Sequence, residues 1–275
     1  MAIISAAALH ADPRRHIFDC RFNLAEPAAG ASAYAEGHIP GAQYLHLDHD
    51  LSGSRTGKNG RHPLPDPHVF ASRLGSLGLT PDMPVAIYDD AGGMFAARVW
   101  WMLHWIGHQA VVSVLDGGIQ AWLAAGFELS QEVQHPAAKS YLLTKTGPVV
   151  KAQDVLNFLG ASSAYLLDAR SADRFRGENE TLDPVGGHIP GAKNRFFRDN
   201  LTDDGHFKPA HQLRTEFMEQ LAGADPSTVV HSCGSGVTAC HNLLAMEVAG
   251  LTGSKLYAGS WSEWSSDPSR PMEKG

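Results

Sequence analysis

The residues in this sequence best suited to do chemistry surround one cysteine near the carboxyl end. An apolar run over 229–231 leads to Cys233, a loop with two glycines follows, and a helix is expected to begin near Thr238. The glycines allow successive backbone N–H groups to turn toward one centre, which forms an anion-binding nest in front of a helix N-terminus. Amide donors and the helix dipole would stabilise a thiolate there. The pattern predicts a nucleophilic cysteine.

The elements that position this loop occur twice. Residues 37–42, GHIPGA, recur letter for letter at 187–192. Landmarks on both sides recur in the same order: residues 18–21 and 167–170, residues 85–93 and 229–236, and residues 115–118 and 256–259. Self-similarity of this kind indicates two copies of one fold. We expect an N-terminal domain over 1–135, a linker over 136–148 and a C-terminal domain over 149–275.

The first copy lacks the reactive side chain. The letter match places Asp90 where the second copy has Cys233. A carboxylate is a poor substitute for a thiolate nucleophile, so we expect the N-terminal domain to be catalytically inactive and the C-terminal domain to be the active one.

Short apolar runs alternate with helical patterns in both copies. Helices with apolar residues at i, i+3 and i+4 are expected at 96–106 and 238–249. Strands are expected at 17–19, 85–88, 111–115, 165–167, 229–231 and 256–257. Such strands joined by helices predict an α/β fold in which each domain is a mainly parallel sheet with helices on both faces. In these sheets active groups lie in loops at the carboxyl ends of strands, which is the position of Cys233.

The chain resembles the two-domain rhodanese superfamily over essentially its whole length. The resemblance lies in the two GHIPGA segments, the first copy without the cysteine and the loop CGSGVT at 233–238. The resemblance implies a sulfurtransferase without a cofactor. The Cys233 thiolate would take a sulfur atom from a donor, become a persulfide and pass the sulfur to a thiophilic acceptor such as cyanide or a thiol. A covalent intermediate of this kind predicts ping-pong kinetics.

The composition of the loop separates the donors that the superfamily uses. Thiosulfate-using rhodaneses typically place basic side chains in this loop, whereas the loop here is uncharged, which is similar to 3-mercaptopyruvate sulfurtransferases. Related phosphatases need an arginine six residues after the cysteine, where this chain has Ala239. The loop residues expected to bind the donor are Gly234, Ser235, Gly236, Val237 and Thr238.

The resemblance also implies a proton relay beside the cysteine. Mercaptopyruvate sulfurtransferases use a loop serine, a histidine and an aspartate, which match Ser235, His62 and Asp48. The chain between Asp48 and His62 is longer than the family pattern, so Asp50 is the alternative aspartate. A serine linked to a titratable histidine can shuttle the proton of a thiol donor. The alternative for His62 is a surface loop position beside Pro63.

The resemblance also implies a cation that binds the carboxylate of the donor. Arg174 matches the family arginine, and a guanidinium can hold a carboxylate with two parallel hydrogen bonds. The alternative is a solvated loop charge. Relatives with two such arginines carry the second one shortly before the second GHIPG, where this chain has Glu180 and Asp183. Arg195 and Arg198 are the candidate substitutes.

Other polar and aromatic residues receive structural interpretations. His38 and His188 occupy the same position of the repeated turn, so we predict a structural hydrogen bond for both. Cys240 stands about two helical turns beyond the nucleophile and is expected to pack away from it. For Trp261 and Trp264, core packing and a wall of the site remain open.

Composition excludes several other classes of protein. The 275 residues carry 22 basic and 29 acidic side chains, a balance that disfavours binding to nucleic acid or to anionic membranes. No apolar run approaches the roughly 18–20 residues of a membrane span, and a cytoplasmic location is expected. Fifteen histidines and three cysteines show no metal-binding spacing, so no metal is expected.

Three functions follow from the sequence. The first is transfer of sulfur from 3-mercaptopyruvate through Cys233, and the second is the thiosulfate:cyanide reaction. The third, from a different class, is a non-catalytic persulfide carrier that delivers sulfur to a partner protein. The expected partners are therefore a small sulfur donor and a thiol or cyanide acceptor, with a protein acceptor left open.

Overall fold

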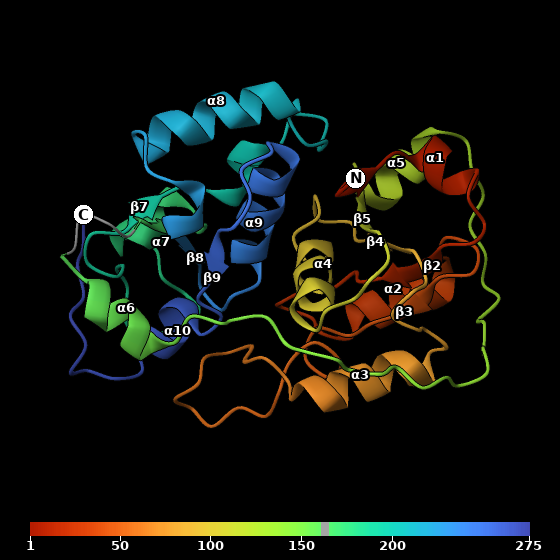
Figure 1. Cartoon of the computed structure of the whole chain (residues 1–275), viewed down its shortest axis with the longest axis horizontal. Coiled ribbons are helices and arrows are strands. Elements are labelled where there is room, and N and C mark those ends of the chain that lie inside the picture. The colour runs from red at the N-terminus through yellow and green to blue at the C-terminus, as the bar shows by residue number, and fades with distance from the viewer. Residues whose placement is uncertain (161–164) are drawn as a thin grey trace. The chain divides into compact units, whose positions relative to one another are not determined.

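The structure is a computed structural model that describes residues 1–160 and 165–275 (Figure 1). The chain forms two compact units. The first contains Met1–Gly53, Leu64–Gly147 and Asp203–His206, and the second contains Ser54–Pro63, Pro148–Thr202 and Phe207–Gly275. Each unit thus includes one short segment from the other half of the chain, an exchange that the repeat pattern did not predict.

The first unit is built on a five-stranded parallel sheet in the order β1-β5-β4-β2-β3. Its strands are β1 (Ile3–Ile4), β2 (His16–Asp19), β3 (Gln43–Tyr44), β4 (Val85–Tyr88) and β5 (Val112–Leu115). Its helices are α1 (Ala6–His10), α2 (Ala29–Glu36), α3 (Pro67–Ser76), α4 (Ala96–Trp105) and α5 (Gly118–Ala124).

The second unit repeats this plan with a four-stranded parallel sheet in the order β7-β6-β8-β9. Its strands are β6 (Tyr165–Asp168), β7 (Lys193–Asn194), β8 (Val229–Ser232) and β9 (Lys255–Leu256). Its α-helices are α6 (Ala152–Phe158), α7 (Ala172–Arg176), α8 (Ala210–Leu221), α9 (Thr238–Val248) and α10 (Ser260–Trp264), and its 3₁₀ helices are η1 (Phe197–Asn200) and η2 (Pro226–Thr228). Because β7-β6-β8-β9 matches β3-β2-β4-β5, the predicted α/β repeat is confirmed.

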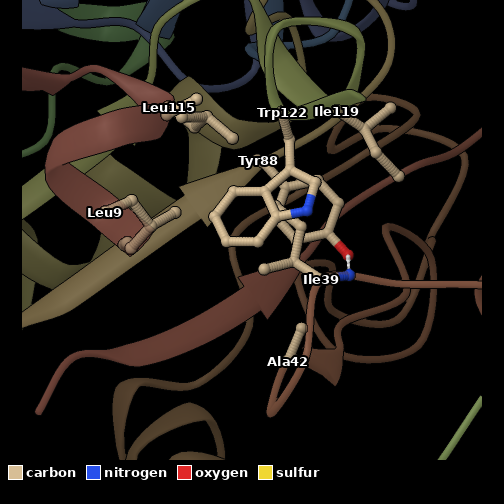
Figure 2. Close-up of a cluster of buried hydrophobic side chains, with 9 residues drawn as sticks. Leu9, Ile39, Ala42, Tyr88, Leu115, Ile119 and Trp122 are labelled. Atoms are coloured by element: carbon tan, nitrogen blue, oxygen red, sulfur yellow. Dashed lines mark hydrogen bonds between the residues drawn. The ribbon is translucent and has the colours of Figure 1, made fainter. Parts of the chain in front are cut away.

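Alternation along the strands lets helices cover both faces of the first sheet. Alternate strand residues point to opposite faces, and Tyr88 of β4 joins a buried cluster with residues of α1 and α5. Figure 2 shows the labelled members of this cluster, which are Leu9, Ile39, Ala42, Tyr88, Leu115, Ile119 and Trp122. The Ile39 N–H donates to the Tyr88 hydroxyl over 3.1 Å (Figure 2), which ties the first GHIPGA turn to β4.

The second sheet is covered in the same way. Figure 1 shows α8 and α9 on one side of its strands and α6 and α10 on the other. Trp261 and Trp264 of α10 are 1% and 0% exposed and pack in the cluster with residues of α6, β6 and β8. Both tryptophans are therefore core residues, which decides the alternative left open by the sequence.

An arginine explains why each GHIPGA segment occurs with a preceding Asp-x-Arg. In the first unit Arg21 Nη2 donates to Asp19 Oδ2 over 2.6 Å and to the Gly37 carbonyl over 2.7 Å. The equivalent residues of the second unit are Arg170, Asp168 and Gly187, with distances of 2.6 and 2.8 Å. Each buried ion pair thereby anchors the turn to the end of a central strand.

The two turn histidines are structural, as predicted. His38 Nδ1 is hydrogen-bonded to the Tyr34 carbonyl over 2.8 Å, and its ring stacks on Tyr34. His188 Nδ1 makes the same kind of bond to the Phe175 carbonyl over 3.0 Å and stacks on Phe175. Within residues 1–160 and 165–275 no group of three or more His, Cys, Asp or Glu side chains could hold a metal ion. In the same part of the chain every helix is too short or too polar to cross a membrane.

Candidate active site

Cys233 lies at the carboxyl end of a central strand and at the start of a short loop. It follows β8 directly, and α9 begins at Thr238. The Cys233 N–H donates to Ser260 Oγ over 3.0 Å, and its carbonyl accepts from the Trp261 N–H over 2.9 Å. The side chain is 2% exposed. The loop and α10 therefore hold the cysteine backbone from both sides.

The loop directs a backbone donor at the sulfur. The Gly236 N–H donates to Cys233 Sγ over 3.1 Å. Gly236 has a φ of 76°, and a Cβ placed on it would lie 2.2 Å from the Ala258 carbonyl oxygen. Only glycine combines this backbone conformation with such a close approach. The amide that faces the sulfur thus depends on a glycine at position 236.

The matching position in the first unit is Asp89. Tyr88 ends β4 and Ser232 ends β8, and both are the final paired residues of equivalent ladders. The next residues are Asp89 and Cys233, so the letter match that placed Asp90 opposite the cysteine was wrong by one residue. The loop after β4 is longer than the loop after β8, and aligning the glycines of two unequal loops shifted the register.

Asp89 fills the first loop with its own negative charge. Oδ1 accepts the N–H groups of Ala91 and Gly93 over 2.9 Å each, and Oδ2 accepts those of Phe95 and Ala96 over 2.8 and 2.9 Å. Burial raises the pKa of this carboxyl group, while the four amide donors oppose the shift. The loop after β4 is therefore an anion-binding nest occupied from within.

A serine and a histidine are joined beside the cysteine. Ser235 Oγ and His62 Nδ1 are hydrogen-bonded over 2.7 Å. Ser235 is 6% exposed and His62 is 4% exposed. His62 belongs to Ser54–Pro63, the segment that groups with the second unit. Its burial excludes the alternative of a surface loop position.

The two candidate aspartates of the relay lie in the first unit. The Asp48 N–H donates to His46 Nδ1 over 3.1 Å. Asp50 uses both carboxylate oxygens: Oδ1 accepts from Arg73 Nε and Oδ2 from the His46 N–H, each over 2.7 Å. Asp50 is thus engaged by Arg73 and by the His46 N–H, and the role of Asp48 in the relay stays a prediction.

Arg174 of α7 is ion-paired rather than solvated. Its Nε and Nη2 donate to Glu180 Oε2 and Oε1 over 3.2 and 2.8 Å. Burial opposes ionisation of Glu180, but Arg174 and the N–H groups of Leu182 and Asp183 together outweigh it, so the pKa of Glu180 is lowered. A Cβ placed on Gly234 would lie 3.5 Å from Arg174 Nη2. The guanidinium thus packs against the residue that follows Cys233.

A second arginine, which was not predicted from the sequence, lies against the same glycine. A Cβ on Gly234 would lie 2.8 Å from Arg61 Nη2. The Arg61 N–H donates to Ser262 Oγ over 3.0 Å, and its guanidinium is paired with Asp183. Arg61 directly precedes His62 in the chain, and this proximity was the signal that could have identified it.

The arginines considered as substitutes lie elsewhere. Arg195 Nη2 donates to Glu216 Oε2 of α8 over 2.7 Å, and its guanidinium lies over the Phe217 ring. Arg198 lies over the ring of Phe197. Cys240 is fully buried on α9, and its thiol donates to the Gly236 carbonyl over 3.3 Å. None of these contacts includes Cys233.

Comparison with known proteins agrees with the repeat. The family model for the Rhodanese-like domain matches residues 5–125 and again residues 151–267. The chain is 48% identical over 278 residues to the "Probable 3-mercaptopyruvate sulfurtransferase" of Pseudomonas aeruginosa, covering 98% of this chain and 95% of that protein. It is 33% identical over 258 residues to the "Thiosulfate sulfurtransferase" of Rattus norvegicus, covering 92% and 85%.

A solved structure shows the same fold over nearly the whole chain. The 3-mercaptopyruvate sulfurtransferase from Leishmania major superposes with a TM-score of 0.84 at 32% identity, covering 96% of this chain and 74% of that one. Both the sequence and the structural relatives are sulfurtransferases by name. The chain therefore belongs to the rhodanese family as a sulfurtransferase with two tandem Rhodanese-like domains.

Proposed function

We propose that this enzyme transfers sulfur from 3-mercaptopyruvate to a thiol or to cyanide through a persulfide on Cys233. The observation that carries the proposal is the uncharged loop at 234–238, in which the Gly236 N–H donates to Cys233 Sγ and Ser235 is bonded to His62. The resemblance to relatives named for this donor supports the same choice.

In the first step the Cys233 thiolate attacks the sulfur of 3-mercaptopyruvate. An S–S bond forms, and the bond between sulfur and carbon breaks with its electron pair leaving on carbon as the enolate of pyruvate. The thiol proton of the donor ends on that carbon, which completes pyruvate. The Gly236 N–H and the helix that begins at Thr238 stabilise the negative charge on sulfur.

Ser235 and His62 are proposed to carry this proton. The serine oxygen can accept the thiol proton while its own hydroxyl proton passes to the imidazole. The pair thus acts as a general base and, in the reverse direction, as a general acid. The proposed third member is Asp48, by resemblance to the family. Proton transfer is needed for a thiol donor but not for thiosulfate, which has no thiol proton.

In the second step an acceptor attacks the outer sulfur of the persulfide. The S–S bond to Cys233 breaks, the thiolate of Cys233 is restored, and the acceptor leaves with the sulfur atom. Because pyruvate leaves before the acceptor reacts, ping-pong kinetics are expected. Arg174, which packs against Gly234, is proposed to bind the carboxylate of the donor.

Thiosulfate is the second candidate donor. Two guanidinium groups, those of Arg61 and Arg174, lie against Gly234, and cations are what a dianionic donor requires. A persulfide carrier for a partner protein remains the third candidate. We further propose a cytoplasmic location, where thiol acceptors stay reduced. We also propose that the domain over 149–275 is the one of the two copies that carries the nucleophile.

The deciding experiment is persulfide formation followed by turnover. The protein is incubated with a single sulfur donor in the absence of acceptor and then analysed by intact-mass spectrometry. The wild-type chain should gain the mass of one sulfur atom, and Cys233→Ser should gain none. The kcat/KM for 3-mercaptopyruvate and for thiosulfate, with cyanide as acceptor, should then favour 3-mercaptopyruvate. A preference for thiosulfate would reject the proposed donor, and turnover by Cys233→Ser would reject the nucleophile. A persulfide that resists cyanide but moves to a protein thiol would support the carrier.

A further inference from the structure

The two arginines beside Gly234 are each matched by a buried acid. The Arg61 guanidinium donates to Asp183 Oδ1, and that of Arg174 is held by Glu180. The side chains of Asp183 and Glu180 are only 3% and 4% exposed. These acids are therefore not surface counter-ions that solvent can screen.

The ion pairs leave one edge of each guanidinium for a ligand. Asp183 binds Nη1 of Arg61, whereas Nη2 of Arg61 faces Gly234. Glu180 binds Nε and Nη2 of Arg174. In the described part of the chain no hydrogen bond is made by Arg61 Nη2 or by Arg174 Nη1. Both arginines can thus donate to an anion without leaving their acids.

Asp183 is poorly satisfied as a structural residue. Its Oδ2 is buried and has no hydrogen-bond partner among the described residues. Arg174 Nη2 lies 3.7 Å from that oxygen, which is beyond hydrogen-bond distance. A buried acceptor without a donor destabilises the fold, so its presence calls for a reason other than stability.

A small anion can reach these groups from solvent. A pocket of about 480 Å³ adjoins the Arg61–Asp183 pair. Its polar lining includes Arg55, Arg61, Asp183, Ser262, Ser265 and Ser266. The Ser262 N–H also donates to the Gly234 carbonyl over 2.9 Å, so the wall of this pocket is bonded directly to the active loop.

We propose that Asp183 and Glu180 select the donor by cancelling the positive charge of Arg61 and Arg174 beside the active loop. This inference rests on the proposed function of the same site. Arg170, which is also near Glu180, is already matched by Asp168. The three arginines Arg61, Arg170 and Arg174 are therefore balanced in charge by the three acids Asp168, Glu180 and Asp183.

Charge cancellation acts unequally on the two donors. The electrostatic energy of an anion is proportional to its charge, so a dianion loses twice as much attraction as a monoanion when a nearby carboxylate offsets an arginine. 3-Mercaptopyruvate carries one negative charge with a neutral thiol, whereas thiosulfate carries two. The arginine N–H groups still orient one carboxylate, but the site offers little net attraction for a second charge.

The test compares isosteric neutral variants of the acids. In Asp183→Asn and Glu180→Gln, kcat/KM for thiosulfate relative to that for 3-mercaptopyruvate should rise about tenfold or more, since one full positive charge becomes uncompensated at short range. Inhibition by sulfate should strengthen relative to inhibition by pyruvate in the same variants. Glu178→Gln is the matched control, because it removes an exposed acid paired with Arg176 on the same segment.

The ratio of donors separates this inference from the proposed function. The donor that the wild-type enzyme prefers tests the proposed function alone. An unchanged ratio in both Asp183→Asn and Glu180→Gln would overturn the selectivity role, as would an equal shift in Glu178→Gln. Because both kcat/KM values come from one preparation, a fraction of misfolded protein does not alter the ratio.

Discussion

Asp89 and Cys233 occupy the same position in two copies of one sheet, and both are anions or potential anions held by loop amides. Four backbone N–H groups surround the Asp89 carboxylate, and the Gly236 N–H points at Cys233 Sγ. The loop after β4 therefore shows that backbone amides at this position of the fold can hold negative charge at the end of a central strand.

Asp89→Asn is expected to destabilise the first unit. The asparagine oxygen could accept from two of the four N–H groups, but the asparagine NH₂ would face the other two and could not accept from them. The free energy of unfolding should therefore fall by about 2–3 kcal/mol. Urea denaturation monitors the change. Asp90→Asn, the next residue and an exposed one, should alter it by less than about 0.5 kcal/mol. A larger loss of stability in Asp90→Asn than in Asp89→Asn would contradict the role of Asp89 as the side chain that holds the loop.

Gly236→Ala is expected to disable the loop. The new Cβ would meet the Ala258 carbonyl and strain a φ of 76°, so the N–H that faces the sulfur must move. Loss of such a donor lowers kcat/KM by about 10²-fold or more. Gly191→Ala is the control, since Gly191 has a φ of 75° and no atom within 4 Å of the added Cβ. Equal activities of the two variants would contradict the role of the Gly236 amide.

Ser235→Ala and His62→Gln should impair one donor more than the other. If the pair moves the thiol proton, each substitution should lower kcat for 3-mercaptopyruvate by about 10²-fold, and the double variant should be no worse than the poorer single one. Thiosulfate turnover by the same preparations is the internal control, because it needs no such transfer. Equal losses with both donors would instead indicate a positioning role for the pair.

Acid is expected to destabilise the second unit through His231. Burial lowers the pKa of this side chain from 6.5 to about 3. Above pH 6.5 the ring is neutral in both the folded and the unfolded chain. As the pH falls from 6.5 toward 3 the unfolded chain binds a proton that the folded chain excludes, so the free energy of unfolding falls by up to about 1.4 kcal/mol per pH unit.

Urea denaturation between pH 7 and pH 4 measures this slope. Substituting His231→Gln should flatten the slope whatever it does to stability at pH 7. His211→Gln is the control, because it removes a histidine at an exposed position of α8 and leaves the buried histidines unchanged. It should not alter the slope. A slope that His231→Gln does not change would place the acid sensitivity on other buried groups. The half-buried His16 and His108 are further candidates, since burial lowers the pKa of each.

The sequence predicted the sheets, the repeat and the loop around Cys233, because these depend on local patterns. Apolar strands, glycines and a repeated turn are recorded within short stretches of chain. Arg61 was not predicted, since its place beside Gly234 depends on which half of the molecule the segment 54–63 joins. Asp89 was missed by one residue because backbone pairing, not matching letters, sets the register. Glu180 and Asp183 were noted as acids in place of a cation, but only the fold reveals that each binds an arginine.

The segment Ser54–Pro63 also means that the second half of the chain cannot be excised as a complete unit. The stretch 149–275 contains the nucleophile, Ser235 and Arg174, but Arg61 and His62 come from the other half of the chain. An excised second half would keep the Cys233 thiol but would lack the imidazole that is bonded to Ser235 and one of the two guanidinium groups that lie against Gly234. The second compact unit is therefore not a continuous half of the chain, because it includes the ten residues Ser54–Pro63 from the first half.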